Sequence, residues 1–133
     1  MENKRQSSTV ESLSFHQKTL RILKAMHETS RFQAVVLTSL EGLPIITLPA
    51  NYGGDVAAAI AGMLRRVSDR AQSQLGMGEM DEVIISDHDH NRLVCRYLPD
   101  GKKGLILAVI VPPGCPYRRA TNRAIWQIKQ LLS

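Results

Sequence analysis

Apolar residues recur at helical spacing in three segments of the chain, and each segment is predicted to be a helix. The first runs over about residues 13–28. Two capping boxes, one starting at Ser8 and one at Ser14, leave its first residue open. The second covers residues 55–75, and the third covers residues 117–132. Helices of this length need a sheet or other helices to cover their apolar faces.

The segments between these helices are β-branched and apolar without helical period, which predicts strands. Five strands are expected, at residues 32–40, 43–48, 83–85, 93–98 and 105–111. Short turns separate the members of each group, so most neighbours are expected to be antiparallel. The order αββαβββα therefore predicts a five-stranded antiparallel sheet between helices, an α+β fold.

Individual residues place some of these strands within the sheet. Gly42 suits the turn of the first hairpin, and Pro44, which cannot donate to a ladder, places the second strand on an edge. The run 105–111 is apolar on both faces, which predicts a central strand covered by helices on both sides. Asp81 and Glu82 beside the third strand are interpreted as solubilising an exposed border.

The second helix carries two different kinds of apolar residue. We take one set, in which large residues predominate, as a core stripe, and a second set of small residues forms a smooth flank opposite or beside it. The stripe comprises Val56, Ile60, Met63, Leu64, Val67, Ala71 and Leu75, and the flank Ala57, Ala58, Ala59, Ala61 and Gly62. The flank has two open interpretations: it lets the helix lie close to its own sheet, or it meets another subunit.

Composition indicates one cytoplasmic domain. The 133 residues suffice for a single core, and we expect a flexible arm at residues 1–12 and one domain at 13–133. No apolar run reaches the roughly 18 residues of a membrane span. The net charge of +5 is compatible with nucleic-acid binding. However, basic residues are scattered along the sequence and only 5% of residues are aromatic, so we expect no nucleic-acid partner. Cys95 and Cys115 are expected to be free thiols.

The sequence contains no complete catalytic or cofactor-binding motif, so we expect no enzyme activity and no cofactor. Gly76 and Gly78 close a helix, and Gly101 belongs to a predicted hairpin turn at 99–101 rather than to a phosphate loop. The loop Asp87-His88-Asp89-His90 offers potential metal ligands, but consecutive ligands in a connecting loop favour a solvated polar turn, and no metal site is assigned.

Three stretches together resemble the roadblock/dynein light chain domain family, over residues from about 14 to the end. They are the Gly42-Leu43-Pro44 hairpin, the alanine-rich helix, and Gly76-Met77-Gly78-Glu79 leading into the third strand. The resemblance implies a profilin-like sheet of strand order 2-1-5-4-3, with the second helix on one face and both terminal helices on the other. It also implies a homodimer through the third strands and second helices.

The resemblance further implies a role as a platform for a Ras-like small GTPase, with an effect on its GTP hydrolysis as a further expectation. By position, the dimer interface would comprise Ile60, Met63, Leu64, Val67, Val83, Ile84 and Ile85. Arg65, Arg66 and Arg70 would reach an acidic partner surface, and an Arg acting in trans on a nucleotide can speed hydrolysis about a thousandfold or more. The alternative function is a purely structural oligomerisation or scaffold module with no GTPase partner.

Overall fold

The computed structural model describes residues 2–98 and 104–132, with side chains from Ser14 onward. Within these residues the element order is αββαβββα, as predicted. The elements are α1 (Glu2–Thr29), β1 (Ala34–Ser39), β2 (Pro44–Leu48), α2 (Gly54–Leu75), β3 (Glu82–Ser86), β4 (Arg92–Leu98), β5 (Leu105–Val111) and α3 (Arg118–Leu132).

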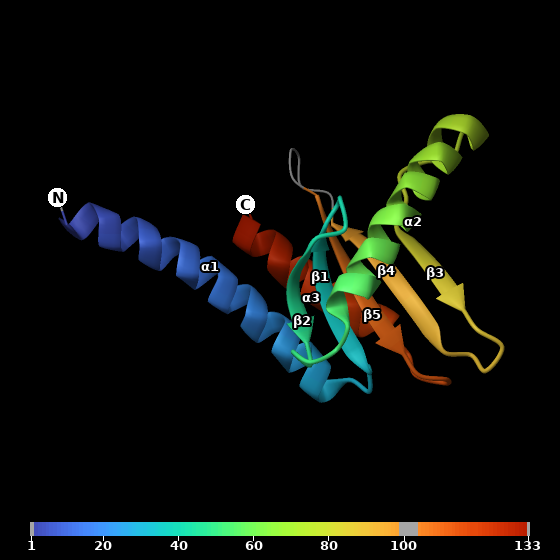
Figure 1. The fold of residues 1–133 in the computed structure, drawn as a ribbon, viewed down its shortest axis with the longest axis horizontal. Coiled ribbons are helices and arrows are strands. Elements are labelled where there is room, and N and C mark those ends of the chain that lie inside the picture. Colours follow the sequence, from blue (N-terminus) through green and yellow to red (C-terminus); the bar gives the residue numbers. More distant parts are fainter. Residues whose placement is uncertain (1, 99–103, 133) are drawn as a thin grey trace.

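The five strands form one antiparallel sheet in the order β2-β1-β5-β4-β3 (Figure 1). The strand order implied by the resemblance is therefore confirmed. The edge position of Pro44 and the central position of β5 are confirmed with it. The register shifts between Leu37 and Thr38, next to the tight turn in which Gly42 has φ +95°.

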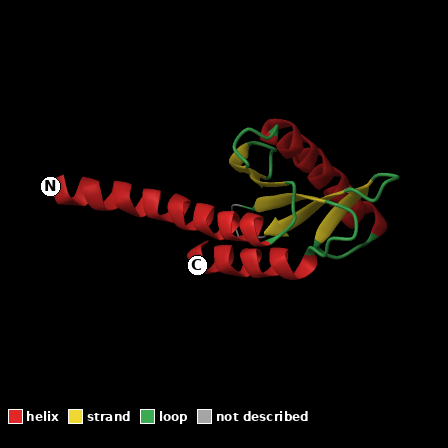
Figure 2. Ribbon diagram, turned by 90° about the horizontal axis from the view of Figure 1, so that it is seen from below, coloured by secondary structure: helices red, strands yellow, loops and turns green. Residues whose placement is uncertain are grey.

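The helices lie on both faces of the sheet (Figure 2). Helix α2 covers one face, where it packs on β1, β2 and β5. Helices α1 and α3 run side by side in opposite directions on the other face. No described helix combines the length and apolar content that crossing a bilayer requires.

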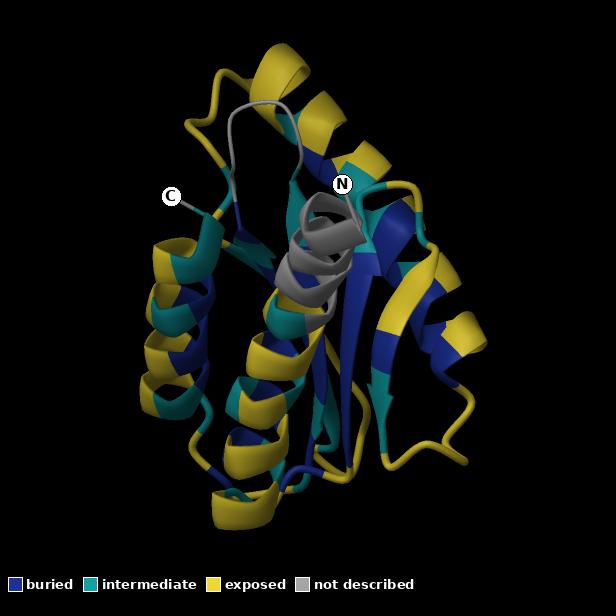
Figure 3. Cartoon of the chain, turned by 90° about the vertical axis from the view of Figure 1, so that its left-hand side faces the viewer, coloured by how far each residue is buried: buried dark blue, intermediate teal, exposed yellow. Residues whose placement is uncertain are grey.

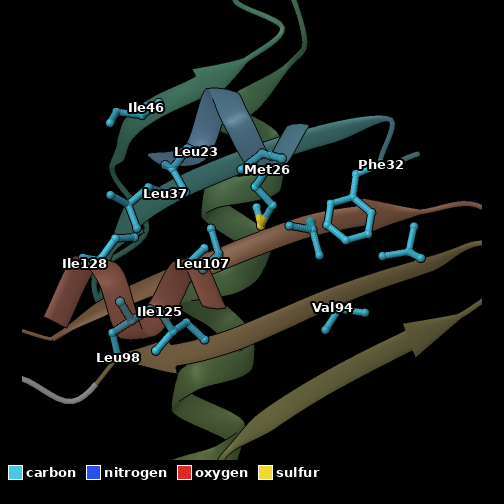
Figure 4. Close-up of a cluster of buried hydrophobic side chains, with 14 of the residues drawn as sticks. Leu23, Met26, Phe32, Leu37, Ile46, Val94, Leu98, Leu107, Ile125 and Ile128 are labelled. Carbon is cyan, nitrogen blue, oxygen red and sulfur yellow. The ribbon is translucent and has the colours of Figure 1, made fainter. Parts of the chain in front are cut away.

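The larger hydrophobic core lies between the sheet and the α1–α3 layer (Figure 4). Leu23 and Met26 of α1, together with Ile125 and Ile128 of α3, pack on strand residues such as Leu107. The buried sides of both helices face inward and their exposed sides face solvent (Figure 3). Full burial of each such side chain contributes about 1.5–3 kcal/mol. This cluster therefore stabilises the fold more than the smaller, alanine-rich cluster under α2.

The smaller core, under α2, corrects our prediction for that helix. Small residues face the sheet: Ala57, Ala58, Ala61 and Gly62 are buried, whereas Val56 is exposed. A side chain at Gly62 would lie 3.0 Å from backbone atoms of the β1–β2 turn. Only small residues allow this close approach, so the first interpretation holds for the four buried flank residues, whereas Ala59 is exposed. Most of the large residues are left on the outer side, and Leu64 packs partly against this core.

The first helix begins earlier than the sequence indicated. Its backbone includes residues 2–12, predicted to be a flexible arm, and the side chains of residues 1–13 lie outside the description. The mobility of the arm and the 13–133 domain boundary therefore stay predictions. The turn predicted at 99–101 also lies outside the described residues.

Candidate interaction surface

The outer side of α2 carries a stripe of large apolar side chains, which we call the α2 stripe: Val56, Ile60, Met63, Leu64 and Val67. Val56, Met63 and Val67 are 61%, 57% and 63% exposed, and Ile60 and Leu64 are half-buried. Their spacing repeats every three or four residues, so they follow one side of the helix. The sheet-facing positions are filled by small residues, and within the described residues Val56, Met63 and Val67 remain open to solvent, whereas Leu64 packs partly against the smaller core.

Strand β3 provides a second apolar surface at the edge of the sheet. It pairs only with β4 among the described strands, so its other side presents free backbone N–H and C=O groups. Ile84 and Ile85 are 40% and 45% exposed, and Val83 is half-buried. Val83 and Ile85 face the α2 layer, because their register partners Cys95 and Leu93 belong to the core on that side.

The three arginines proposed for partner contact separate into two groups. Arg65 forms an ion pair with Asp69 at 3.6 Å, and both line a cavity of about 390 Å³ beside Tyr97. Arg66 and Arg70 are exposed, one helical turn apart, and neither forms an ion pair with another described residue. Two of the three are therefore free to meet an acidic surface.

Tyr97 links α2 to the sheet by a hydrogen bond beside the same cavity. Its hydroxyl lies 3.1 Å from that of Ser68, which in turn donates to the carbonyl of Leu64 at 2.8 Å. Desolvation raises the pKa of Tyr97, so the phenol is neutral at pH 7. This contact holds the carboxyl half of α2 over β4.

An ion-pair cluster at the start of β3 corrects the interpretation of Asp81 and Glu82 as a solubilising border. Arg96, with only 5% of its side chain exposed, lies 3.3 Å from Asp81 and 3.6 Å from Glu82. Exposed Arg118 of α3 contacts the same two carboxylates at 3.0 and 2.8 Å. The two acids thus link the edge strand to α3. No local sequence pattern predicts this cluster, because its members lie far apart in the chain.

The rest of the Arg96 side chain is held by α3. It donates to Thr121 Oγ1 and Asn122 Oδ1, both at 2.7 Å. Its Nε and the facing Oε2 of Glu82 are buried, and at 3.6 Å they interact by charge without a hydrogen bond. Tyr117 donates to the other oxygen of Glu82, and desolvation together with this carboxylate raises the pKa of the tyrosine.

The Asp87–His90 loop forms a compact turn that occupies its own carboxylate. Asp87 Oδ1 accepts the backbone N–H groups of Asp89 and Asn91, both at 2.9 Å, and Oδ2 accepts the Asn91 side chain at 3.0 Å. These hydrogen bonds, that of the Asn91 side chain foremost, lower the pKa of Asp87. Among the described residues, no three His, Cys, Asp or Glu side chains gather as metal ligands would.

No family model and no curated protein matches the chain. Among solved structures, Myxococcus xanthus MglB superposes with a TM-score of 0.74 at 13% identity, covering 87% of this chain and 88% of that one. A Roadblock/LC7 domain from Streptomyces avermitilis gives a TM-score of 0.61 at 15% identity, covering 82% and 87%. The chain has the roadblock/LC7 fold.

A third structure with this roadblock/LC7 fold is the gliding protein MglB from Thermus thermophilus. It superposes with a TM-score of 0.67 at 13% identity, covering 89% of this chain and 90% of that one. Together with the sheet order, these superpositions confirm the fold implied by the sequence resemblance. The seven interface residues and the three arginines stay predictions, and the structure adds where each of them lies.

Proposed function

We propose that this chain is a homodimeric adaptor that docks a Ras-like small GTPase. The observation that carries the proposal is the orientation of α2, which turns its small residues to the sheet and its large apolar residues to solvent. A stripe of this kind is unfavourable in water, and such patches usually mark protein contacts. Burying each large side chain there would contribute about 1.5–3 kcal/mol.

The edge strand β3 supports a second copy of the chain as the occupant. Two β3 strands can pair antiparallel across a two-fold axis, which satisfies the free backbone groups of both. Such pairing would make one continuous sheet and would bring the two α2 helices to the same side of it. The same surfaces are then used by both subunits, as a two-fold interface requires.

The GTPase part of the proposal rests on the family resemblance, because roadblock domains act as platforms for such proteins. Arg66 and Arg70 support it: they are exposed, unpaired within the described structure and next to the α2 stripe. They would contact an acidic surface of the GTPase at the rim of the dimer. A positioned Arg near the nucleotide would raise the hydrolysis rate, whereas a purely anchoring contact would leave it unchanged.

We include a non-enzymatic role and a cytoplasmic location in the proposal. Both cysteines are free and buried, which fits a reducing compartment. Burial raises the pKa of Cys95 to about 12, so its thiol is a poor nucleophile at neutral pH.

The dimer is tested by sedimentation of two matched variants, Ile85→Lys and Ile45→Lys. Both isoleucines are 45% exposed and lie on edge strands, but on opposite edges of the sheet. We expect Ile85→Lys to give monomers at micromolar concentration, because a charge would lie in the paired edge, while Ile45→Lys stays dimeric. Equal sedimentation of the two variants, or a monomeric unmodified chain, would contradict the proposed dimer.

The same preparations test the docking of the GTPase. We expect the unmodified chain to co-elute with a Ras-like small GTPase from the same organism, and Arg66→Ala/Arg70→Ala to weaken that binding while sedimentation stays dimeric. GTP turnover then separates stimulation from anchoring. A dimer that binds the GTPase in neither nucleotide state would overturn the docking proposal and favour the structural oligomerisation module.

A further inference from the structure

A groove lies along the face opposite α2, between α1 and α3. It has a volume of about 550 Å³. Ile22, Ala25 and Met26 line it from α1, and Ala120 and Ala124 line it from α3. The α1 residues follow one side of that helix at i, i+3 and i+4, so the groove runs along the helix axes. Its walls are low because three of these five residues are alanine.

Three arginines stand at the rim of the groove. Arg31 follows α1, and Arg119 and Arg123 lie one turn apart on α3. None of them forms an ion pair with a described residue, and no acidic side chain among the described residues lines the groove. Unpaired arginines around an apolar floor favour an occupant that is apolar on one side and acidic beside it.

The positive charge of the chain is concentrated on this α1–α3 layer. Residues 14–33 contain Lys18, Arg21, Lys24 and Arg31 against a single acid, Glu28. Helix α3 has three further basic residues besides the ion-paired Arg118, and no Asp or Glu. Helix α2 is nearly balanced by comparison, with three Arg and two Asp. Basic residues that are scattered along the sequence are therefore gathered in space on this layer.

We propose that this groove docks an acidic amphipathic helix of a partner protein. The apolar side of the partner helix would lie on Ile22, Met26 and the alanines, as in other helix-in-groove complexes. Its flanking carboxylates would meet Arg119 and Arg123 on one side and Arg31 on the other. The small residues allow the partner backbone to come close, and burial between the rims strengthens each ion pair.

A helix fits these features better than the other partners of a basic surface. A bilayer is flat and leaves a groove unfilled. Single-stranded nucleic acid requires aromatic stacking platforms, whereas none of the described residues that line this groove is aromatic. The surface lies on the opposite face of the sheet from α2. The inference therefore does not depend on the proposed dimer, and it would give each subunit a second docking site.

The test uses a fluorescein-labelled peptide of about 18 residues with Leu at i, i+3, i+4 and i+7 and Glu on both flanks. One control peptide replaces every Glu by Lys, and a second scrambles the sequence at constant composition. Anisotropy is measured at about 0.15 M salt, where weak surface attraction is largely screened. Large anionic vesicles and duplex DNA are titrated in parallel.

Three variants locate the binding site. Arg119→Glu/Arg123→Glu inverts the rim charge, and we expect at least tenfold weaker binding. Ala25→Phe changes no charge but fills the groove from its α1 wall, and we expect a similar loss. Arg66→Glu/Arg70→Glu makes the same charge change on α2 and should leave binding unchanged. Circular dichroism confirms that each variant is folded.

The proposal is supported when the acidic amphipathic peptide binds at least tenfold tighter than both control peptides, and when the two groove variants no longer bind it with that affinity. It is overturned when the scrambled peptide binds within about twofold, because that would show attraction to charge without a groove. It is equally overturned when vesicles or DNA bind more tightly than the peptide through Arg119 and Arg123, or when the groove variants bind normally.

Discussion

At the scale of single residues, Arg96 shows how much one buried charge depends on its partners. Four side chains surround its guanidinium: Asp81, Glu82, Thr121 and Asn122. A buried charge is tolerated only when such partners offset its lost hydration. These contacts join β3, β4 and α3 at the proposed pairing edge, so the position of that edge depends on this one side chain.

We expect Arg96→Met to lower the free energy of unfolding by about 3 kcal/mol, because the change leaves Glu82 without its buried partner. Arg118→Met is the matched control: it removes the other contact to the same carboxylates, but this side chain is 56% exposed and water replaces it. Its effect should be much smaller. Urea unfolding of both variants measures the difference, and equal losses would show that burial is not the deciding factor.

At the scale of elements, the β1–β2 turn and α2 determine each other's position. Gly42 has φ +95°, and a Cβ there would lie 2.9 Å from the carbonyl oxygen of Ala58. The turn and the helix therefore touch backbone to backbone. This contact explains why small residues face the sheet and why the apolar stripe faces outward.

We expect Gly42→Ala to destabilise the protein by about 3 kcal/mol, because backbone strain and a clash with α2 act together. Gly76→Ala is the control, since Gly76 also has positive φ (+68°) but a Cβ added there would meet no atom within 4 Å. Strain alone should cost about 1 kcal/mol there. Thermal unfolding of both variants separates the two contributions, and a similar loss for each would contradict a packing role for Gly42.

At the scale of the whole molecule, the sheet separates two unequal layers with different surfaces. The α1–α3 layer holds the larger core and most of the positive charge, and the α2 layer holds a thin core of small residues. Cys95 is enclosed in the thin layer, against Val36 and Ala108. Its burial depends on both the sheet and α2 being in place, so its titration reports on the assembled fold.

Burial raises the pKa of Cys95 from 9.0 to about 12. Below pH 9 the thiol is neutral in both the folded and the unfolded chain, so its contribution to stability is fully present there. That contribution is lost as the pH rises through the folded value, because the unfolded thiol ionises first. We expect the free energy of unfolding to fall between pH 9 and 12, and to fall less steeply in Cys95→Val. Urea titrations across this range test it, and identical slopes for both proteins would show that other groups control alkaline unfolding.

The amino-acid sequence by itself determined the order and type of the elements, the Gly42 turn and the edge position of Pro44. These features follow from local periodicity and local backbone preferences, which do not need distant partners. The tertiary structure decided which side of α2 faces the sheet, since both sides are apolar and only the approach of the Gly42 turn selects the small one. It also decided the partners of Arg96 and the gathering of charge around the α1–α3 groove, because those residues are far apart in the chain and meet only when the layers pack.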